Sequence, residues 1–254
     1  MNKLITSMLV LVLLGACNGQ TVRNTKLQPS AHTNNVTMTN LNLGIEYMRT
    51  GNYERALEKL NRAKEADPGY FATYNAFGLL YQELKAPARA EENFKQALSL
   101  NPSDSATLNN YGRFLCQNGR RKEAEKIFKQ AADNPLYETP EVAIANAGTC
   151  ALLDGNKEEA EAFFRQALKL NPKVPTALLQ MAEISYDRGD YLPARGFLQR
   201  YMAVAEHTPA SLWLGIRIEE ELGNKDAVSS YALLLRNRYP DSSEAALLKE
   251  SGAR

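Results

Sequence analysis

The residues of this sequence with the most distinctive chemistry are its cysteines, because a thiolate is a nucleophile and can also form a disulfide. The 254 residues include three: Cys17, Cys116 and Cys150. Cys17 follows a short apolar run, residues 4–14, which has Lys3 before it and two small residues after it. This order of charge, apolar run and small residues is typical of a secretory signal peptide. The run is shorter than the ~20 residues that span a bilayer, so it predicts export and no transmembrane helix.

The four residues LGAC at 14–17 resemble the lipobox of bacterial lipoproteins. This resemblance implies that residues 1–16 are removed and that the Cys17 thiol carries a covalent lipid, with no other cofactor expected. More than one acyl chain anchors a protein stably, whereas a single chain does not. The next residue is Asn18 and not the Asp that retains such lipoproteins at the inner membrane, so we expect the periplasmic face of the outer membrane. The alternative is an ordinary signal peptide that happens to contain a cysteine.

The composition of the remaining chain limits its partners. Removing residues 1–16 removes one Lys and no acid, which leaves 29 basic and 29 acidic residues. A neutral balance lacks the basic face of a nucleic-acid-binding protein, and we expect no nucleic acid partner. Residues 17–36 comprise the lipidated cysteine and a polar stretch rich in Asn and Thr, which predicts a flexible tether.

From residue 37 the sequence repeats about every 34 residues. Small residues recur at Gly44, Gly78, Gly112, Gly148, Ala182 and Gly215, and alanines recur in step at Ala56, Ala90, Ala124, Ala160, Ala194 and Ala227. A large residue follows each of these alanines by four positions: Leu60, Phe94, Phe128, Phe164, Leu198 and Tyr231. This pattern resembles the tetratricopeptide repeat, in which two antiparallel helices, A and B, form each unit.

The resemblance implies an all-α fold: a right-handed superhelix, or α-solenoid, of about six repeats. The predicted domain covers 37–254, with repeats at 37–70, 71–104, 105–140, 141–174, 175–207 and 208–240 and a capping helix at 241–254. A single helix pair cannot bury its apolar face, whereas stacked pairs can, and the A helices then line a concave groove. Small residues suit the places where A and B approach closely, and a proline ends helix B in three repeats.

Cys116 and Cys150 lie in the predicted A helices of the third and fourth repeats, at nearly matching heights. Neighbouring A helices pack side by side, and export brings the chain into an oxidising compartment. We therefore expect a disulfide between Cys116 and Cys150. The alternative is a pair of buried thiols that act as small apolar side chains.

The groove is expected at the second, fifth, ninth and twelfth positions of each repeat. In the first repeat these are Met38, Leu41, Ile45 and Met48, and all four are apolar. Methionine adapts to varied partners, so this strip predicts a site for a helix or an extended peptide, unless the chain's own tether covers it. Asn75 and Leu79 lie beside the strip in the second repeat, and amides such as Asn75 and Asn109 can hold a peptide backbone.

We expect no catalytic residue and no metal site. Metalloprotease, nucleophile-elbow and P-loop motifs do not occur, and the sequence contains only two histidines. The recurring tyrosines follow the repeat and are expected in the core. These features favour a monomeric binding protein over an enzyme.

Three segments also resemble the PilF/PilW family of type IV pilus biogenesis lipoproteins: NLGIEYMRTGNYERALEKLNRAKEADP, YNAFGLLYQELKAPARAEENFKQAL and LNNYGRFLCQNGRRKEAEKIFKQA. This resemblance implies the role of a pilotin, which binds subunits of the outer-membrane secretin and promotes their localisation and assembly. An alternative is a lipoprotein that scaffolds periplasmic proteases or cell-wall enzymes, since the same anchor and repeats would serve it.

Overall fold

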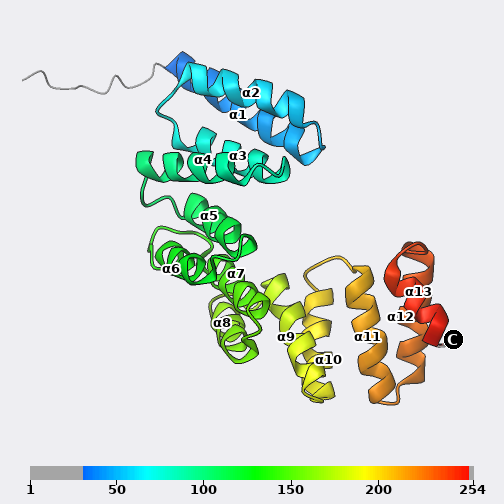
Figure 1. Ribbon diagram of the computed structural model, residues 1–254. Coiled ribbons are helices and arrows are strands. Elements are labelled where there is room, and N and C mark those ends of the chain that lie inside the picture. Colours follow the sequence, from blue (N-terminus) through cyan, green and yellow to red (C-terminus); the bar gives the residue numbers. More distant parts are fainter. Residues whose placement is uncertain (1–30, 252–254) are drawn as a thin grey trace, which may run out of the picture.

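The computed structural model describes residues 31–251, with side chains from residue 35, and the regular structure in this range is entirely helical (Figure 1). The helices are α1 (Ala31–Arg49), α2 (Tyr53–Ala66), α3 (Phe71–Glu83), α4 (Pro87–Leu100), α5 (Ser105–Gln117), α6 (Arg121–Ala132), α7 (Pro140–Leu153), α8 (Lys157–Leu170), α9 (Pro175–Asp187), α10 (Tyr191–Met202), α11 (Pro209–Glu221), α12 (Lys225–Arg238) and α13 (Ser243–Ser251). The predicted signal peptide and Cys17 lie outside the described residues.

The helices form six antiparallel pairs, each made of an odd-numbered A helix and the even-numbered B helix that follows it. Each A helix also contacts the A helix of the next pair, from α1 and α3 to α9 and α11, and α11 contacts the unpaired last helix, α13. Figure 1 shows the pairs stacked along a curved path from α1, in blue, to α13, in red. The predicted fold class, an α-solenoid of six repeats, is confirmed. Between residues 31 and 251, no helix combines the length and apolar character needed to cross a bilayer.

The first helix begins earlier than the sequence predicted. We expected a tether up to residue 36, whereas α1 begins at Ala31. Residues 31–36 contain neither Gly nor Pro, so nothing in them interrupts a helix that forms further along. A side-chain bond lies at the end of this segment, where the Asn40 amide donates to the carbonyl of Val36 at 2.9 Å.

The turns between A and B helices explain the spacing of a second set of glycines. These turns place a residue in the left-handed region of φ in every repeat, at Gly51, Lys85, Gly119, Gly155, Gly189 and Gly223. Five of the six are glycine, which adopts positive φ without steric cost. Lys85, with φ of 55°, is the exception. Side-chain caps fix the starts of α2, α5, α8, α11 and α12. In α5, for example, Asp104 accepts from the Thr107 amide at 2.7 Å.

Large side chains of the B helices fill the space between repeats. Phe94, Phe128 and Phe164 are at most 1% exposed. Each lies over the small residue of its own A helix: a Cβ on Gly112 would come within 2.7 Å of the Phe128 ring. Phe94 also contacts Phe114 of the next repeat, with ring centroids 5.6 Å apart. The core is therefore continuous from one repeat to the next.

The last helix covers the C-terminal end of the stack. Ala245 and Leu248 of α13 are buried in one cluster with Leu212 and Ile216 of α11. Ser242 caps α13 by accepting from the Ala245 amide at 3.1 Å. This helix lies within the segment 241–254 for which we expected a cap.

Candidate partner-binding groove

Met38 and Ile45 of α1 present exposed apolar side chains on the face where the groove is expected, and Met48 beside them packs partly against the core of the first repeat. We call these three residues the first-repeat strip. Met38 and Ile45 are 42% and 46% exposed, and Met48 is half-buried. Positions 38 and 45 are seven residues apart, so they lie on one face of the helix. Residues 31–45 contain no acidic or basic residue except His32, and this face therefore has little charge.

Leu41, which we also expected in the strip, is a core residue. It is 4% exposed and belongs to one buried cluster with Leu60 of α2 and Ala76 of α3. The expectation that a partner contacts Leu41 is therefore wrong. The fifth position of α1 points into the seam between α1 and α3, where the two A helices pack, and the ninth position faces outward.

The groove continues onto α3 with Asn75 and Leu79, both half-buried. Leu79 packs against the core of the third repeat. The Asn75 side-chain oxygen accepts a hydrogen bond from the amide of Asn110 on α5 at 3.2 Å. Asn75 thus links neighbouring A helices while remaining accessible.

The same bond recurs one repeat later. The Asn146 amide of α7 donates to the side-chain oxygen of Asn109 on α5 at 2.9 Å. We call the bonds Asn75–Asn110 and Asn109–Asn146 the two amide rungs. Asn110 and Asn146 were missed in the sequence, because the sixth position was not counted as part of the groove. Their separation of 36 residues, which equals the interval between Gly112 and Gly148, was the available signal.

The structure joins Cys116 of α5 to Cys150 of α7 by a disulfide, with Cα atoms 5.8 Å apart. Both side chains are buried, at 7% and 3% exposure. Cys116 occupies the twelfth position of its repeat, which we counted as groove, and its burial removes it from the accessible surface. The bond and the second amide rung therefore tie the same two helices together.

A charged cluster joins the second and third repeats on the other side of the A helices. Glu91 of α4 accepts from Arg120 at 2.6 Å and from the hydroxyl of Tyr111 at 3.1 Å, and it pairs with Lys95. Hydrogen bonds from Arg120 and Lys95 lower the pKa of Glu91 to about 2. Burial, together with the bond to Glu91, raises the pKa of Tyr111 to about 12. Both shifts favour the charged carboxylate and the neutral phenol at neutral pH.

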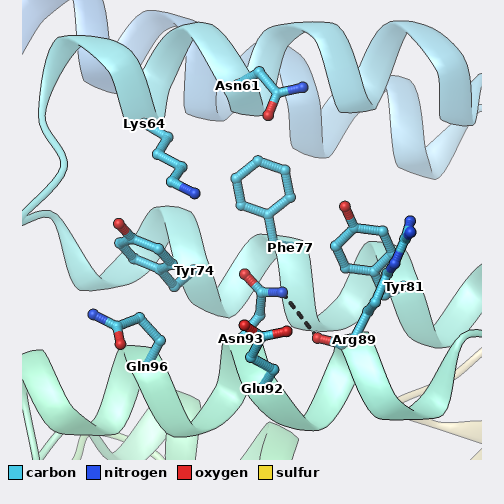
Figure 2. A pocket seen from close by; sticks show the side chains of 9 residues that line it. All are labelled: Asn61, Lys64, Tyr74, Phe77, Tyr81, Arg89, Glu92, Asn93 and Gln96. Carbon is cyan, nitrogen blue, oxygen red and sulfur yellow. Dashed lines mark hydrogen bonds between the residues drawn. The ribbon is translucent and has the colours of Figure 1, made fainter.

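A separate cleft of about 410 Å³ lies on the B-helix side, between α2 and α4, with α3 as its floor (Figure 2). Figure 2 shows Tyr74, Phe77 and Tyr81 of α3 in the middle, with Lys64 near one end and Arg89 near the other. Lys64 lies 5.6 Å from the ring centroid of the buried Tyr74, and Arg89 lies 5.6 Å from that of the half-buried Tyr81, so both cations cover aromatic rings. Among the described residues, no three His, Cys, Asp or Glu side chains come together as metal ligands.

Comparison with known proteins agrees with the repeat architecture. Tetratricopeptide repeat families match residues 39–70, 81–136 and 151–213. A type IV pilus assembly protein, PilF of Pseudomonas aeruginosa, is 31% identical over 204 residues, which are 80% of this chain and 81% of PilF. The chain belongs to the PilF/PilW family.

Solved structures of family members extend over nearly the same range. The structure of P. aeruginosa PilF matches with a TM-score of 0.74 and 29% identity, and it covers 87% of this chain and 99% of its own. PilW, described as a widely conserved type IV pilus biogenesis factor, matches with a TM-score of 0.71 and 32% identity, over 84% of this chain and 98% of its own. Membership of the PilF/PilW family places the chain among proteins of type IV pilus biogenesis, and its repeats indicate a role in protein interaction.

Proposed function

We propose that this protein is a pilotin: an outer-membrane lipoprotein that binds subunits of the type IV pilus secretin and promotes their localisation and multimerisation. Pilus assembly and twitching motility would then depend on it. The observation that carries the proposal is the exposed first-repeat strip on α1, next to α3 with its amide Asn75. The chain that presents this surface is a member of the PilF/PilW family. The protein acts by binding alone, as a monomer, with the lipid on Cys17 as its only added group.

The strip provides a source of binding energy. Completing the burial of Met38 and Ile45 against a partner contributes on the order of 1 kcal/mol for each side chain, given their present half-exposure. Methionine side chains adjust to the shape of a partner, which suits capture of a flexible segment from a subunit before it assembles. The low charge of this face allows an apolar segment to dock without desolvating ion pairs.

The anchor limits where capture occurs. Thirteen residues, 18–30, separate Cys17 from the start of α1. A chain of this length reaches at most about 45 Å. A lipid on Cys17 would therefore hold the first repeat within that distance of the membrane, where a secretin subunit must insert.

The function is tested in a strain that lacks the gene and is complemented with variants, by measuring the ratio of secretin multimer to monomer. The double variant Met38→Glu, Ile45→Glu should restore few multimers. Leu43→Glu is the matched control, because Leu43 lies on the opposite face of the same helix and is 41% exposed. Normal multimers in the deletion strain would refute the pilotin role. Full rescue by the double variant would refute the contact surface only.

The anchor is tested separately with Cys17→Ser, which should leave the helical content unchanged and release the protein from the outer-membrane fraction. Persistence of the variant in that fraction would contradict lipid anchoring. If the deletion instead leaves secretin multimers intact and disrupts complexes of periplasmic proteases or cell-wall enzymes, the scaffold alternative is supported.

A further inference from the structure

The two amide rungs have hydrogen-bonding capacity that the fold does not use. A carboxamide offers two N–H donors and an oxygen with two lone pairs. In the first rung the Asn75 oxygen accepts from the Asn110 nitrogen, and in the second the Asn109 oxygen accepts from the Asn146 nitrogen. Within residues 35–251, the Asn75 and Asn109 nitrogens and the Asn110 and Asn146 oxygens form no hydrogen bond, and none of the four is among the buried unpaired atoms.

Asn75 is half-buried and Asn109 is 8% exposed, yet neither side-chain nitrogen is fully enclosed. Each rung therefore offers an unused N–H donor on one helix beside an unused carbonyl oxygen on the next. This is the complement of a polypeptide backbone, which offers a C=O acceptor and an N–H donor. The rungs carry no formal charge, so they are suited to backbone atoms more than to charged side chains. Thr149, close to the second rung on α7, uses its hydroxyl to donate to the Ala145 carbonyl at 3.1 Å and does not compete.

The spacing of the rungs selects a conformation. The rungs occupy equivalent positions in successive repeats, so they are one A-helix spacing apart, which is about 8–10 Å for packed helices. A polyproline II segment has three residues per turn and rises ~3.1 Å per residue, so it turns the same face to a surface every ~9 Å. A β-strand presents the same face every second residue, or about 7 Å, and matches less well.

We propose that the amide rungs bind the backbone of an extended, polyproline II-like partner segment, with one rung to every third residue. The inference deepens the proposed function, since it rests on the groove as the binding surface, but it does not depend on the secretin being the partner. The first-repeat strip then supplies apolar contact at one end, and the rungs set direction and conformation. Recognition along α3, α5 and α7 is consequently tolerant of side-chain sequence.

The decisive variant is the double change Asn75→Asp, Asn109→Asp. A carboxylate still accepts from Asn110 or Asn146, so both bonds between helices are kept. It has no N–H, so the donor to the partner's carbonyl is lost and repulsion replaces it. The matched control is Gln199→Glu, Asn237→Asp, which adds the same charge at two exposed B-helix positions.

The probes are dodecapeptides selected from a random displayed library on the purified, full-length mature protein. We expect the double Asp variant to bind these peptides about tenfold or more weakly, since each lost hydrogen bond contributes about 0.5–1.5 kcal/mol and 1.4 kcal/mol corresponds to tenfold. The control should bind within twofold of wild type. Unchanged thermal unfolding shows that the inter-helix bonds persist.

N-methylation of the peptide backbone gives a second measurement on the unmodified protein. Methyl groups should weaken binding by about tenfold at positions three residues apart and be tolerated between them. Four outcomes would each overturn the inference. Two concern the bound peptide: it becomes helical by circular dichroism, or methylation weakens binding at every second residue. The other two are equal binding by the double Asp variant and a library that yields no binders. Binding of intact secretin, measured beside the peptides, separates the two proposals. If the peptides need the rungs and secretin does not bind, the rungs are supported and the secretin is refuted as the partner.

Discussion

The ring of Phe94 lies against the backbone of Gly78, so closely that a Cβ atom on Gly78 would stand 2.6 Å from a ring carbon. Phe94 is fully buried and also contacts the rings of Tyr111 and Phe114 in the next repeat. The ring cannot move aside without disturbing the third repeat. One small residue thus controls both the packing within its own helix pair and the contact to the next one.

Gly78→Ala should therefore destabilise the fold by about 1–3 kcal/mol, the usual cost of overpacking a core. The sign of the change in the free energy of unfolding is diagnostic, because Gly→Ala inside a helix otherwise stabilises the protein by up to about 1 kcal/mol. Gly196→Ala is the control: Gly196 lies within α10, and a Cβ there meets no atom within 4 Å. Urea unfolding of both variants measures the difference, and a stabilised Gly78→Ala protein would contradict the packing.

Lys85 occupies the turn position that is glycine in the other five repeats, and its φ is 55°. A residue with a Cβ in this region is strained by roughly 1 kcal/mol, so Lys85→Gly should raise the free energy of unfolding by up to that amount. Lys126→Gly within α6 should lower it by a similar amount, because glycine weakens a helix interior. Equal and opposite shifts in the urea midpoint are expected, and a loss of stability in Lys85→Gly would argue against the turn geometry.

The Glu91 cluster makes stability depend on acid pH. The folded-state pKa of Glu91 is about 2, well below the value of 4.5 that is usual for a glutamate. A lowered pKa means that the stabilisation is present above about pH 4.5 and is lost as the pH falls towards 2. The free energy of unfolding of wild type should exceed that of Glu91→Gln by on the order of 2 kcal/mol at pH 6, and the difference should be smaller at pH 3.

Chemical unfolding at the two pH values measures this gap. Glu92→Gln serves as the control, because Glu92 is the exposed neighbour and forms no ion pair among residues 35–251. A gap for Glu91→Gln that stays constant from pH 6 to pH 3 would show that the carboxylate charge does not carry the effect.

The bond between Cys116 and Cys150 closes a loop with a sequence separation of 34 residues. By the chain-entropy estimate, replacing both cysteines with Ala should cost about 3–4 kcal/mol. Native protein isolated from cells should gain two hydrogens in intact mass on reduction. Two free thiols in native material, or a double variant as stable as wild type, would rule out a stabilising disulfide in the cell.

Periodicity in the sequence was sufficient to predict the repeats, because each spacing that recurs along the chain reflects a contact within one helix pair. The Gly78–Phe94 contact is of this kind. The groove was predicted less well. Met38 and Ile45 are accessible as expected, whereas Leu41 is buried and Asn110 and Asn146 were missed. Neighbouring residues on a helix point in directions that differ by 100°. A small error in the assumed rotation of the helix about its axis therefore assigns a core residue to the groove, or a groove residue to the core.

By itself, the amino-acid sequence determined the number of repeats, the helix pairs and the small residues at their closest approach, because these depend on interactions between residues fewer than about 30 positions apart. Only the tertiary structure decided which side chains face the groove, that Asn75 meets Asn110, and where α1 begins. Those features depend on the angle between successive A helices, which the packing of whole repeats sets and no single repeat encodes.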